Sequence, residues 1–385
     1  MLGNPLLNKI AYKLRGMIRL RPRGGARGNA LLYYMCEPFL YGDETLPLRH
    51  TNLWECRQMA KTLLEMGYRV DVVDWQNKSF IPKKKYDVVI DIHDSLPRLT
   101  PYLPSSCKKI FHITGSHWLF CVPAEYKRLA ALKERRGVVL LPRRVVPPDF
   151  NAEYMDAGTV LGNSFTQDTF TYANKPLYHV PISTTATFPY PESKDFENAK
   201  KNFLWFGGSG MVHKGLDLVL EAFAKMPELS LTVVGPVHKE ADFEKAYHKE
   251  LYETPNIRTL GFLDVEGKEL ETVLKETTYL IYPSCSEGGG GSVVAMMHAG
   301  LIPIISYESS VTVENFGVIL KESSVEEIER SVRTMSGLPA SEVASRSKQA
   351  WEYARAHHSR EVFAVALKAA LLDILQNKKT HAAKN

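Results

Sequence analysis

The sequence predicts an α/β protein built from two doubly wound parallel sheets. A strand–helix rhythm starts near residue 30, stops in a proline-rich and charged stretch over 186–200, and restarts over a second half of similar length. A chain of 385 residues is long for a single core, so two domains are expected. The apolar content of 44% and charged content of 24% are typical of a soluble globular protein.

Residues 1–29 are predicted to form a basic amphipathic arm. They carry seven Lys or Arg and no acid, which leaves the rest of the chain near −2 from a total of +5. A helix over 6–20 would place Leu6, Leu7, Ile10, Leu14, Met17 and Ile18 on one stripe. Such a helix can lie on an anionic membrane, or it can be a solvated arm or pack on the body. The local basicity argues against nucleic acid binding.

The N-terminal domain is expected over 30–185. Its short apolar runs, bounded by polar turns, are typical of parallel strands buried on both faces. Strands are expected at 30–36, 68–75, 86–93, 108–115, 137–142, 157–164 and 176–182, and helices at 51–67, 124–137 and 164–173.

The C-terminal domain is expected over 201–376, after the linker 186–200. Strands are expected at 202–208, 229–236, 256–263, 278–284 and 301–306, and helices at 214–226, 240–253, 267–277, 292–300, 324–335, 341–356 and 360–376. We expect the last helix to pack back on the first domain and the tail 377–385 to be disordered. In two doubly wound sheets, ligands bind at the carboxyl ends of the strands and in the cleft between domains.

The loop "FGGSGMVHKG" (206–215) follows a strand and opens a helix, which suits a phosphate. Lys214 adds a point charge beside Gly208, Ser209, Gly210 and His213. The loop is not a Walker A motif, because no GK[ST] follows, and it lacks the third glycine of the dinucleotide fingerprint, which disfavours an NAD-dependent dehydrogenase. A plain tight turn is the alternative interpretation.

A second loop, "SCSEGGGGSVVAMMHAG" (284–300), holds four consecutive glycines. Glycine loses more conformational freedom on folding than other residues, so the run should be needed for bare backbone. Amides from Gly288 to Ser292 could bind an anion or sugar hydroxyls at the start of the helix. Glu287 could accept hydrogen bonds from hydroxyls, or it could be an ordinary solvated turn residue.

The second half resembles the donor-binding domain of family-4 glycosyltransferases, which have the two-domain GT-B fold. "EGGGGSVVAMMHAG" matches their acidic motif from Glu287 to Gly300, and "KGLDLVLEAF" matches a second segment. The resemblance covers most of 203–320. Ala295 stands where the family has a second Glu that holds the ribose, and Ser209 stands where it has a phosphate-binding Arg.

The resemblance implies roles for these residues. Lys214 would stabilise the departing diphosphate and Glu287 would orient the sugar, and His117 is chosen as the histidine that reaches the sugar from the first domain. His112 is expected in the core. The implied donor-binding residues are Gly208, Ser209, Gly210, His213, Phe262, Gly288, Gly289, Gly290, Gly291, Ser292 and Val293. The acceptor candidates are Arg49, His50 and His93.

The resemblance therefore implies a metal-independent, retaining glycosyltransferase without a cofactor. It would move a hexose or deoxyhexose from a nucleotide diphosphate sugar to a saccharide or lipid-linked acceptor in cell-surface polysaccharide or lipopolysaccharide biosynthesis. The alternatives are a catalytically silent GT-B protein that binds a sugar nucleotide or a partner, and a nucleotide-sugar epimerase. The base, sugar, acceptor, linkage and oligomeric state stay open.

The five cysteines are odd in number and lack CxxC spacing, which predicts reduced thiols and no zinc site. No apolar run reaches eighteen residues and no signal peptide is found, so a cytoplasmic protein is expected. The basic arm could hold it on the inner face of the membrane.

Overall fold

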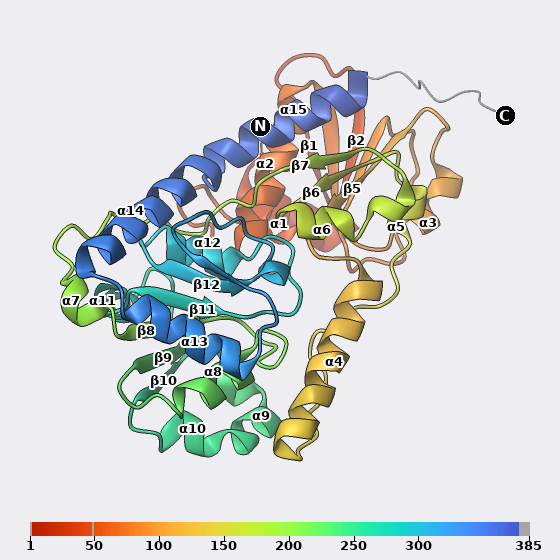
Figure 1. The fold of residues 1–385 in the computed structure, drawn as a ribbon. Coiled ribbons are helices and arrows are strands. Elements are labelled where there is room, and N and C mark those ends of the chain that lie inside the picture. The colour runs from red at the N-terminus through yellow and green to blue at the C-terminus, as the bar shows by residue number, and fades with distance from the viewer. Residues whose placement is uncertain (1, 48–49, 377–385) are drawn as a thin grey trace.

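The computed structural model describes residues 2–47 and 50–376. The chain forms two α/β domains, each built on its own sheet with helices packed around it (Figure 1). Arg49 and the predicted disordered tail 377–385 lie outside the described residues. The predicted fold class is confirmed.

The first sheet has seven strands. They lie in the order β1 (Met17–Leu20), β3 (Tyr68–Asp74), β2 (Gly28–Tyr34), β4 (Val88–Asp91), β5 (Lys108–Ile113), β6 (Ala157–Val160) and β7 (Leu177–His179). All neighbours are parallel except β1, which runs antiparallel to β3 at the edge. Its helices are α1 (Pro5–Arg15), α2 (Thr51–Glu65), α3 (Leu96–Leu99), α4 (Trp118–Arg136), α5 (Asn151–Tyr154) and α6 (Ser164–Asp168).

The second sheet has six strands, all parallel. Their order is β10 (Ile257–Gly261), β9 (Ser230–Val234), β8 (Asn202–Phe206), β11 (Tyr279–Tyr282), β12 (Ile302–Ser306) and β13 (Val318–Leu320). Its helices are α8 (Leu216–Phe223), α9 (Ala241–Ala246), α10 (His248–Tyr252), α11 (Lys268–Glu276), α12 (Gly291–Met297) and α13 (Val325–Ser336). Because the strand order reverses between β8 and β11, the loops that follow these two strands lie side by side.

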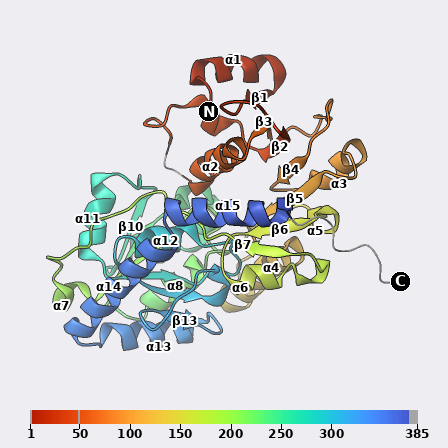
Figure 2. The same ribbon diagram turned by 90° about the horizontal axis from the view of Figure 1, so that it is seen from above.

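The basic arm differs from the predicted helix over 6–20. Helix α1 ends at Arg15, because Gly16 adopts a left-handed φ of 64° and its N–H bonds back to the carbonyl of Tyr12. The chain then enters β1, whose Ile18 is fully buried in the first domain's core. Residues 17–20 are therefore part of the first sheet. Figure 2 shows α1 at the outer end of the first domain, away from the second.

The predicted strand over 137–142 is wrong. Val139 and Leu141 are exposed and Leu140 is buried, so the alternation of a strand is present, but this stretch pairs with no strand. Helix α4 instead starts at Trp118, earlier than predicted, and projects from the first domain along the second (Figure 1). Leu140 joins the second domain's apolar core. Residues 118–149 are called the α4 segment below.

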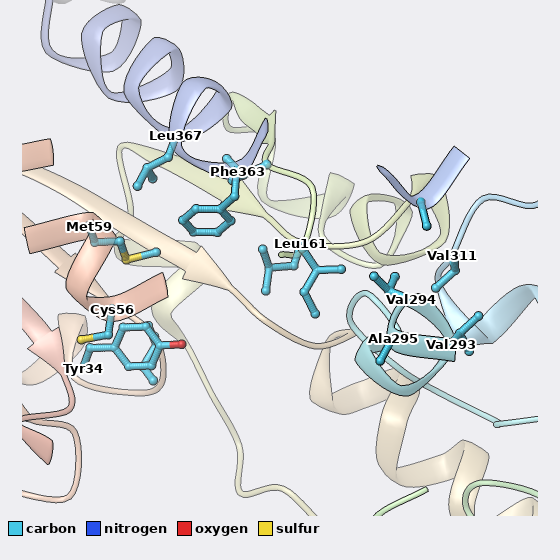
Figure 3. Packing of buried hydrophobic residues seen from close by; sticks show 14 of the residues in the cluster. Tyr34, Cys56, Met59, Leu161, Val293, Val294, Ala295, Val311, Phe363 and Leu367 are labelled. Atoms are coloured by element: carbon cyan, nitrogen blue, oxygen red, sulfur yellow. The ribbon is translucent and has the colours of Figure 1, made fainter. Parts of the chain in front are cut away.

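The C-terminal helices return to the first domain. The linker holds the short α7 (Phe196–Ala199), and α14 (Ala340–His357) packs on α12. Helix α15 (Arg360–Gln376) packs against α2, β6 and β7. Figure 3 shows Phe363 of α15 in a buried cluster with Leu161 of the first domain and Val294 of α12. This apolar cluster is continuous across the two domains.

Candidate functional site

The loops after β8 and β11 are joined by His213. Its Nε2 donates to the carbonyl of Ser286 at 2.6 Å, and its own carbonyl accepts from the N–H of Cys285 at 2.8 Å. Burial lowers the pKa of His213 to about 4, so the ring is neutral at pH 7. His213 therefore holds the two predicted loops together as an uncharged group.

Glu287 and Lys214 form an ion pair between the same loops. The Glu287 Oε1 atom accepts from the Lys214 Nζ at 2.5 Å, from the Tyr282 hydroxyl at 2.8 Å and from the Ser284 hydroxyl at 2.9 Å. Burial alone would raise the pKa of Glu287, but the Lys214 charge holds that pKa at about 2. The Glu287 carboxylate is thus ionised, and it offsets the charge of the Lys214 ammonium.

The first glycine loop has fewer available amides than its sequence predicts. The N–H groups of Gly210 and Met211 both donate to the buried carboxylate of Glu240, at 2.5 and 3.1 Å. Gly208 and Ser209 are exposed, and within the described chain their N–H groups donate to no protein acceptor. An anion at this loop would therefore find the amides of Gly208 and Ser209.

The glycine run after Glu287 permits a close approach of the first domain. A Cβ on Gly288 would lie 2.2 Å from the Thr114 carbonyl oxygen and 2.4 Å from the Gly115 Cα. Gly289 has a φ of 128° and packs against Gly162, also of the first domain. The predicted need for bare backbone is real, and contact between domains accounts for it at these two positions.

The remaining predicted residues of this loop begin helix α12. Gly290 and Val293 are buried, whereas Gly291 and Ser292 are half-buried. Ala295, which stands at the family's second Glu, is also buried.

A cavity of about 440 Å³ lies between the domains beside Glu287. Of the predicted site residues that the structure describes, His93, His117, His213, Glu287 and Gly288 line it. The first domain contributes most of the wall, including Trp75, Thr114, Gly115, Trp118, Arg144 and Asp149. Its size suits a small-molecule ligand, and its walls combine aromatic and polar groups, as ligand sites generally do.

The predicted first-domain histidines have different surroundings. His93 packs on Trp75 with ring centroids 4.3 Å apart, and burial lowers its pKa to about 4. His117 caps α4, with Nδ1 accepting from the Leu119 N–H at 3.3 Å. His112 is fully buried and bonded to a threonine, as expected for a core residue.

His117 also stands between the main cavity and a second one of about 420 Å³. Its Nε2 donates to the Tyr172 hydroxyl at 3.1 Å, and that hydroxyl donates to Glu153 at 3.0 Å. The second cavity is lined by His117, Trp118, Leu119, Phe120, Phe150, Glu153, Thr169 and Tyr172. Both ring nitrogens of His117 are engaged, so it is built into the wall.

Outside the two glycine loops, two predicted residues that the structure describes, His50 and Phe262, line neither cavity. His50 is exposed and caps α2 by accepting from the Asn52 N–H at 3.2 Å. Phe262 is 66% exposed and follows β10, the edge strand two positions from β8. Arg49, the neighbour of His50, lies outside the described residues.

The sequence interpretation missed Arg144 and Asp149, both in the α4 segment and both lining the main cavity. Burial raises the pKa of Asp149 to about 7. The only sequence signals were the Arg143–Arg144 pair and the two prolines that follow it, where the prediction placed a strand end.

No group of His, Cys, Asp or Glu within residues 2–47 and 50–376 has the arrangement of a metal site. Among the helices of the described part, none combines the length and apolar character that a membrane crossing needs. All five cysteines are free thiols.

Comparison with known families finds a match in the second half of the chain. Residues 191–356 match the family model described as glycosyl transferases group 1. No curated protein sequence matches the chain significantly.

Three solved structures illustrate the similarity of fold. Sucrose-phosphate synthase from Thermosynechococcus elongatus has 14% identity, a TM-score of 0.61, and coverage of 91% of this chain and 99% of that one. Anabaena HepE, solved with UDP and glucose, has 13% identity, a TM-score of 0.54, and coverage of 91% and 100%. S. aureus TarM has 13% identity, a TM-score of 0.52, and coverage of 75% and 55%, so the chain spans about half of TarM. These likenesses confirm the GT-B fold, and together with the family match they support a glycosyltransferase.

Proposed function

We propose that the protein is a retaining glycosyltransferase that takes a hexose or deoxyhexose from a nucleotide diphosphate sugar. The acceptor would be a saccharide or a lipid-linked saccharide in cell-surface polysaccharide or lipopolysaccharide assembly. The observation that carries the proposal is the Glu287 carboxylate at the edge of the interdomain cavity, in the domain that matches the glycosyl transferase family. TarM and HepE, which share the fold, were both solved with UDP, and this supports a nucleotide-linked donor.

Glu287 is arranged to orient a sugar. Its Oε1 atom already accepts three hydrogen bonds, whereas its Oε2 atom accepts none from the described residues. A hydroxyl of the donor sugar could therefore donate to Oε2 without displacing Lys214. Positioning of this kind lowers the barrier by fixing the reacting geometry.

The departing diphosphate needs stabilisation as its negative charge grows. The free N–H groups of Gly208 and Ser209 supply fixed dipoles for that charge, which is electrostatic catalysis. Lys214 acts on the sugar instead, because its ammonium is bound to Glu287 and fixes the position of that carboxylate. In the retaining mechanism of this proposal, the acceptor hydroxyl attacks from the side of the leaving diphosphate.

Three observations favour a catalytically silent sugar-nucleotide or partner binder as the second candidate. Lys214 is neutralised by Glu287, the Gly210 amide is occupied by Glu240, and Ala295 provides no carboxylate. A silent protein would bind a nucleotide sugar and leave it intact.

One assay with a panel of nucleotide sugars separates the transferase, the silent protein and an epimerase. The protein is incubated with UDP-, GDP-, dTDP- and CMP-sugars, with and without saccharide acceptors, and released nucleotide is measured for wild type and Glu287→Gln. Donor hydrolysis or transfer that Glu287→Gln abolishes supports the proposal. Binding without turnover across the panel supports the silent protein, and sugar conversion without any acceptor indicates an epimerase.

We also propose that α1 holds the protein on an anionic membrane. Leu6, Leu7, Ile10 and Leu14 of α1 are 48–76% exposed, and Lys9, Lys13 and Arg15 are exposed on the same helix. Exposed leucines beside lysines suit the interface of an anionic bilayer. This arrangement would bring a lipid-linked acceptor to the enzyme.

The membrane proposal is tested by liposome flotation with point variants, because deletion of residues 1–29 would also remove β1. Wild type should float with anionic vesicles and less with neutral ones, and Leu7→Ser/Leu14→Ser should remain in the soluble fraction. Equal recovery of wild type and variant with anionic vesicles contradicts the proposal.

A further inference from the structure

The charges of the second-domain loops do not favour a diphosphate. Lys214 and Glu287 cancel each other, and His213 is neutral at pH 7. The buried Glu240 side chain accepts the N–H groups of Gly210 and Met211, so these two amides are not available to an anion. Because the Lys214 ammonium is already paired with Glu287, a further cation from outside these loops would favour diphosphate binding.

The α4 segment of the first domain brings several arginines to the second domain, and most of them are engaged there. Arg128 donates to the Pro283 carbonyl at 2.8 Å, and Arg135 pairs with Asp217 at 2.7 Å. Arg136 pairs with Glu250, and Arg143 pairs with Asp242. These contacts fix the segment against the second domain.

Arg144 is the exception in this segment. Its side chain passes over Gly210, since a Cβ on that glycine would lie 2.9 Å from the Arg144 Cγ. It also lines the main cavity with Glu287 and His213. Within the described chain its guanidinium donates no hydrogen bond, so its donors are available to a ligand.

The backbone of Arg144 is held in place by a buried carboxylate. Glu125, which is 1% exposed, accepts from the Arg143 N–H at 2.9 Å and from the Arg144 N–H at 2.9 and 3.0 Å. The Cα of Arg144 is therefore fixed while its guanidinium stays free. Arg144 is therefore preorganised to bind a ligand.

We propose that Arg144 binds the diphosphate of the donor against the Gly208 and Ser209 amides. The anion site is then shared between the two domains, with the cation supplied by the first. A guanidinium can bind two phosphate oxygens at once, which a lysine cannot match. This inference rests on the proposed nucleotide-sugar donor and assigns the residue that recognises its diphosphate.

The test is titration calorimetry with inorganic diphosphate and with UDP, GDP and dTDP, for wild type, Arg144→Gln and Arg143→Gln. Loss of hydrogen bonds to a charged group corresponds to about 10- to 100-fold weaker binding. Arg144→Gln should lose affinity by this factor for inorganic diphosphate and for the preferred nucleotide. Arg143→Gln, the adjacent arginine that pairs with Asp242, should stay within about twofold of wild type.

Two further measurements keep the result interpretable. Arg144→Lys should recover part of the lost affinity, because it restores the charge but not the two-point contact. The melting temperature of Arg144→Gln should equal that of wild type, because the guanidinium makes no hydrogen bond in the described protein. Diphosphate affinity of Arg144→Gln within twofold of wild type, or no diphosphate binding by wild type, overturns the proposal.

The outcomes also separate this inference from the proposed function. Arg144-dependent binding of inorganic diphosphate without any sugar transfer supports the anion site and contradicts the transferase. Sugar transfer with unchanged diphosphate affinity in Arg144→Gln supports the transferase and contradicts the anion site.

Discussion

The contact at Gly288 gives a prediction that can be worked out from distances. In Gly288→Ala the new methyl would lie 2.2 Å from the Thr114 oxygen and 2.4 Å from the Gly115 Cα. Both partners are backbone atoms, so no side-chain rotation relieves the clash. Ordinary contacts are about 3.5 Å, so the two domains must separate here by about 1 Å.

That separation has a cost. Overpacking of a tight contact typically costs about 1–3 kcal/mol. It also disturbs two interdomain hydrogen bonds beside the clash, between the Ser116 and Ser286 hydroxyls at 2.5 Å and from the Thr166 hydroxyl to the Glu287 carbonyl at 3.3 Å. Gly288→Ala should therefore weaken the closed arrangement of the domains.

Gly291→Ala is the matched control, because its methyl would meet only Ile182 at an ordinary 3.6 Å. The assay is hydrogen exchange of peptides over 113–118 and 285–291, together with the urea midpoint. Gly288→Ala should exchange faster in both peptides and unfold at lower urea, whereas Gly291→Ala should match wild type. Equal protection in the two variants would refute the account of the glycine run.

Three other predictions concern buried charges. Lys214→Met and Glu287→Gln should each lower the free energy of unfolding by about 3–5 kcal/mol. The double variant should lose less than the sum of the two, and additive losses in urea unfolding would contradict an ion pair between these residues. In the folded protein the Asp149 carboxyl keeps its proton up to about pH 7, whereas in the unfolded chain it ionises near pH 4. The stability that comes from this raised pKa is therefore lost as pH rises from about 4 to 7. Asp149→Asn should accordingly become more stable than wild type at pH 8 and match it at pH 4, and a pH-independent difference in urea midpoint would contradict this. Arg135→Ala leaves the carboxylate of Asp217 without its ion-pair partner and should speed proteolysis within α4; unchanged cleavage rates would show that α4 is held by other contacts.

The fold was predictable because its strands are short, apolar and bounded by turns. Strands such as β5 and β11 are buried along most of their length, and this gives the continuous apolar runs seen in the sequence. The position of the two loops was predictable for the same reason, since both follow strands of one parallel sheet.

The α4 segment was not predictable from periodicity. The stretch over 137–142 alternates as a strand does, but Leu140 is buried against the other domain and no strand lies beside it. Alternation reports which side chains are buried and not what buries them. For the same reason the sequence did not indicate Arg144, because its proposed role depends on a contact with Gly210, which lies 66 positions later in the sequence.

The sequence predicted which residues form the candidate site better than it predicted what each residue does. Lys214 and Glu287 were both expected near the donor, but their spacing of 73 residues gave no sign that they pair. The glycine run was expected to bind a ligand through its amides; Gly288 does line the interdomain cavity, but Gly288 and Gly289 also lie against backbone of the first domain. A glycine run signals close approach without naming the partner.

The most direct test of the central claim is a crystal structure of the protein with a nucleotide diphosphate sugar that binds in solution. The account predicts the diphosphate within hydrogen-bond distance of the Ser209 amide and the Arg144 guanidinium, with a sugar hydroxyl on the Glu287 carboxylate. A nucleotide bound elsewhere, with the interdomain cavity empty beside Glu287, would contradict it.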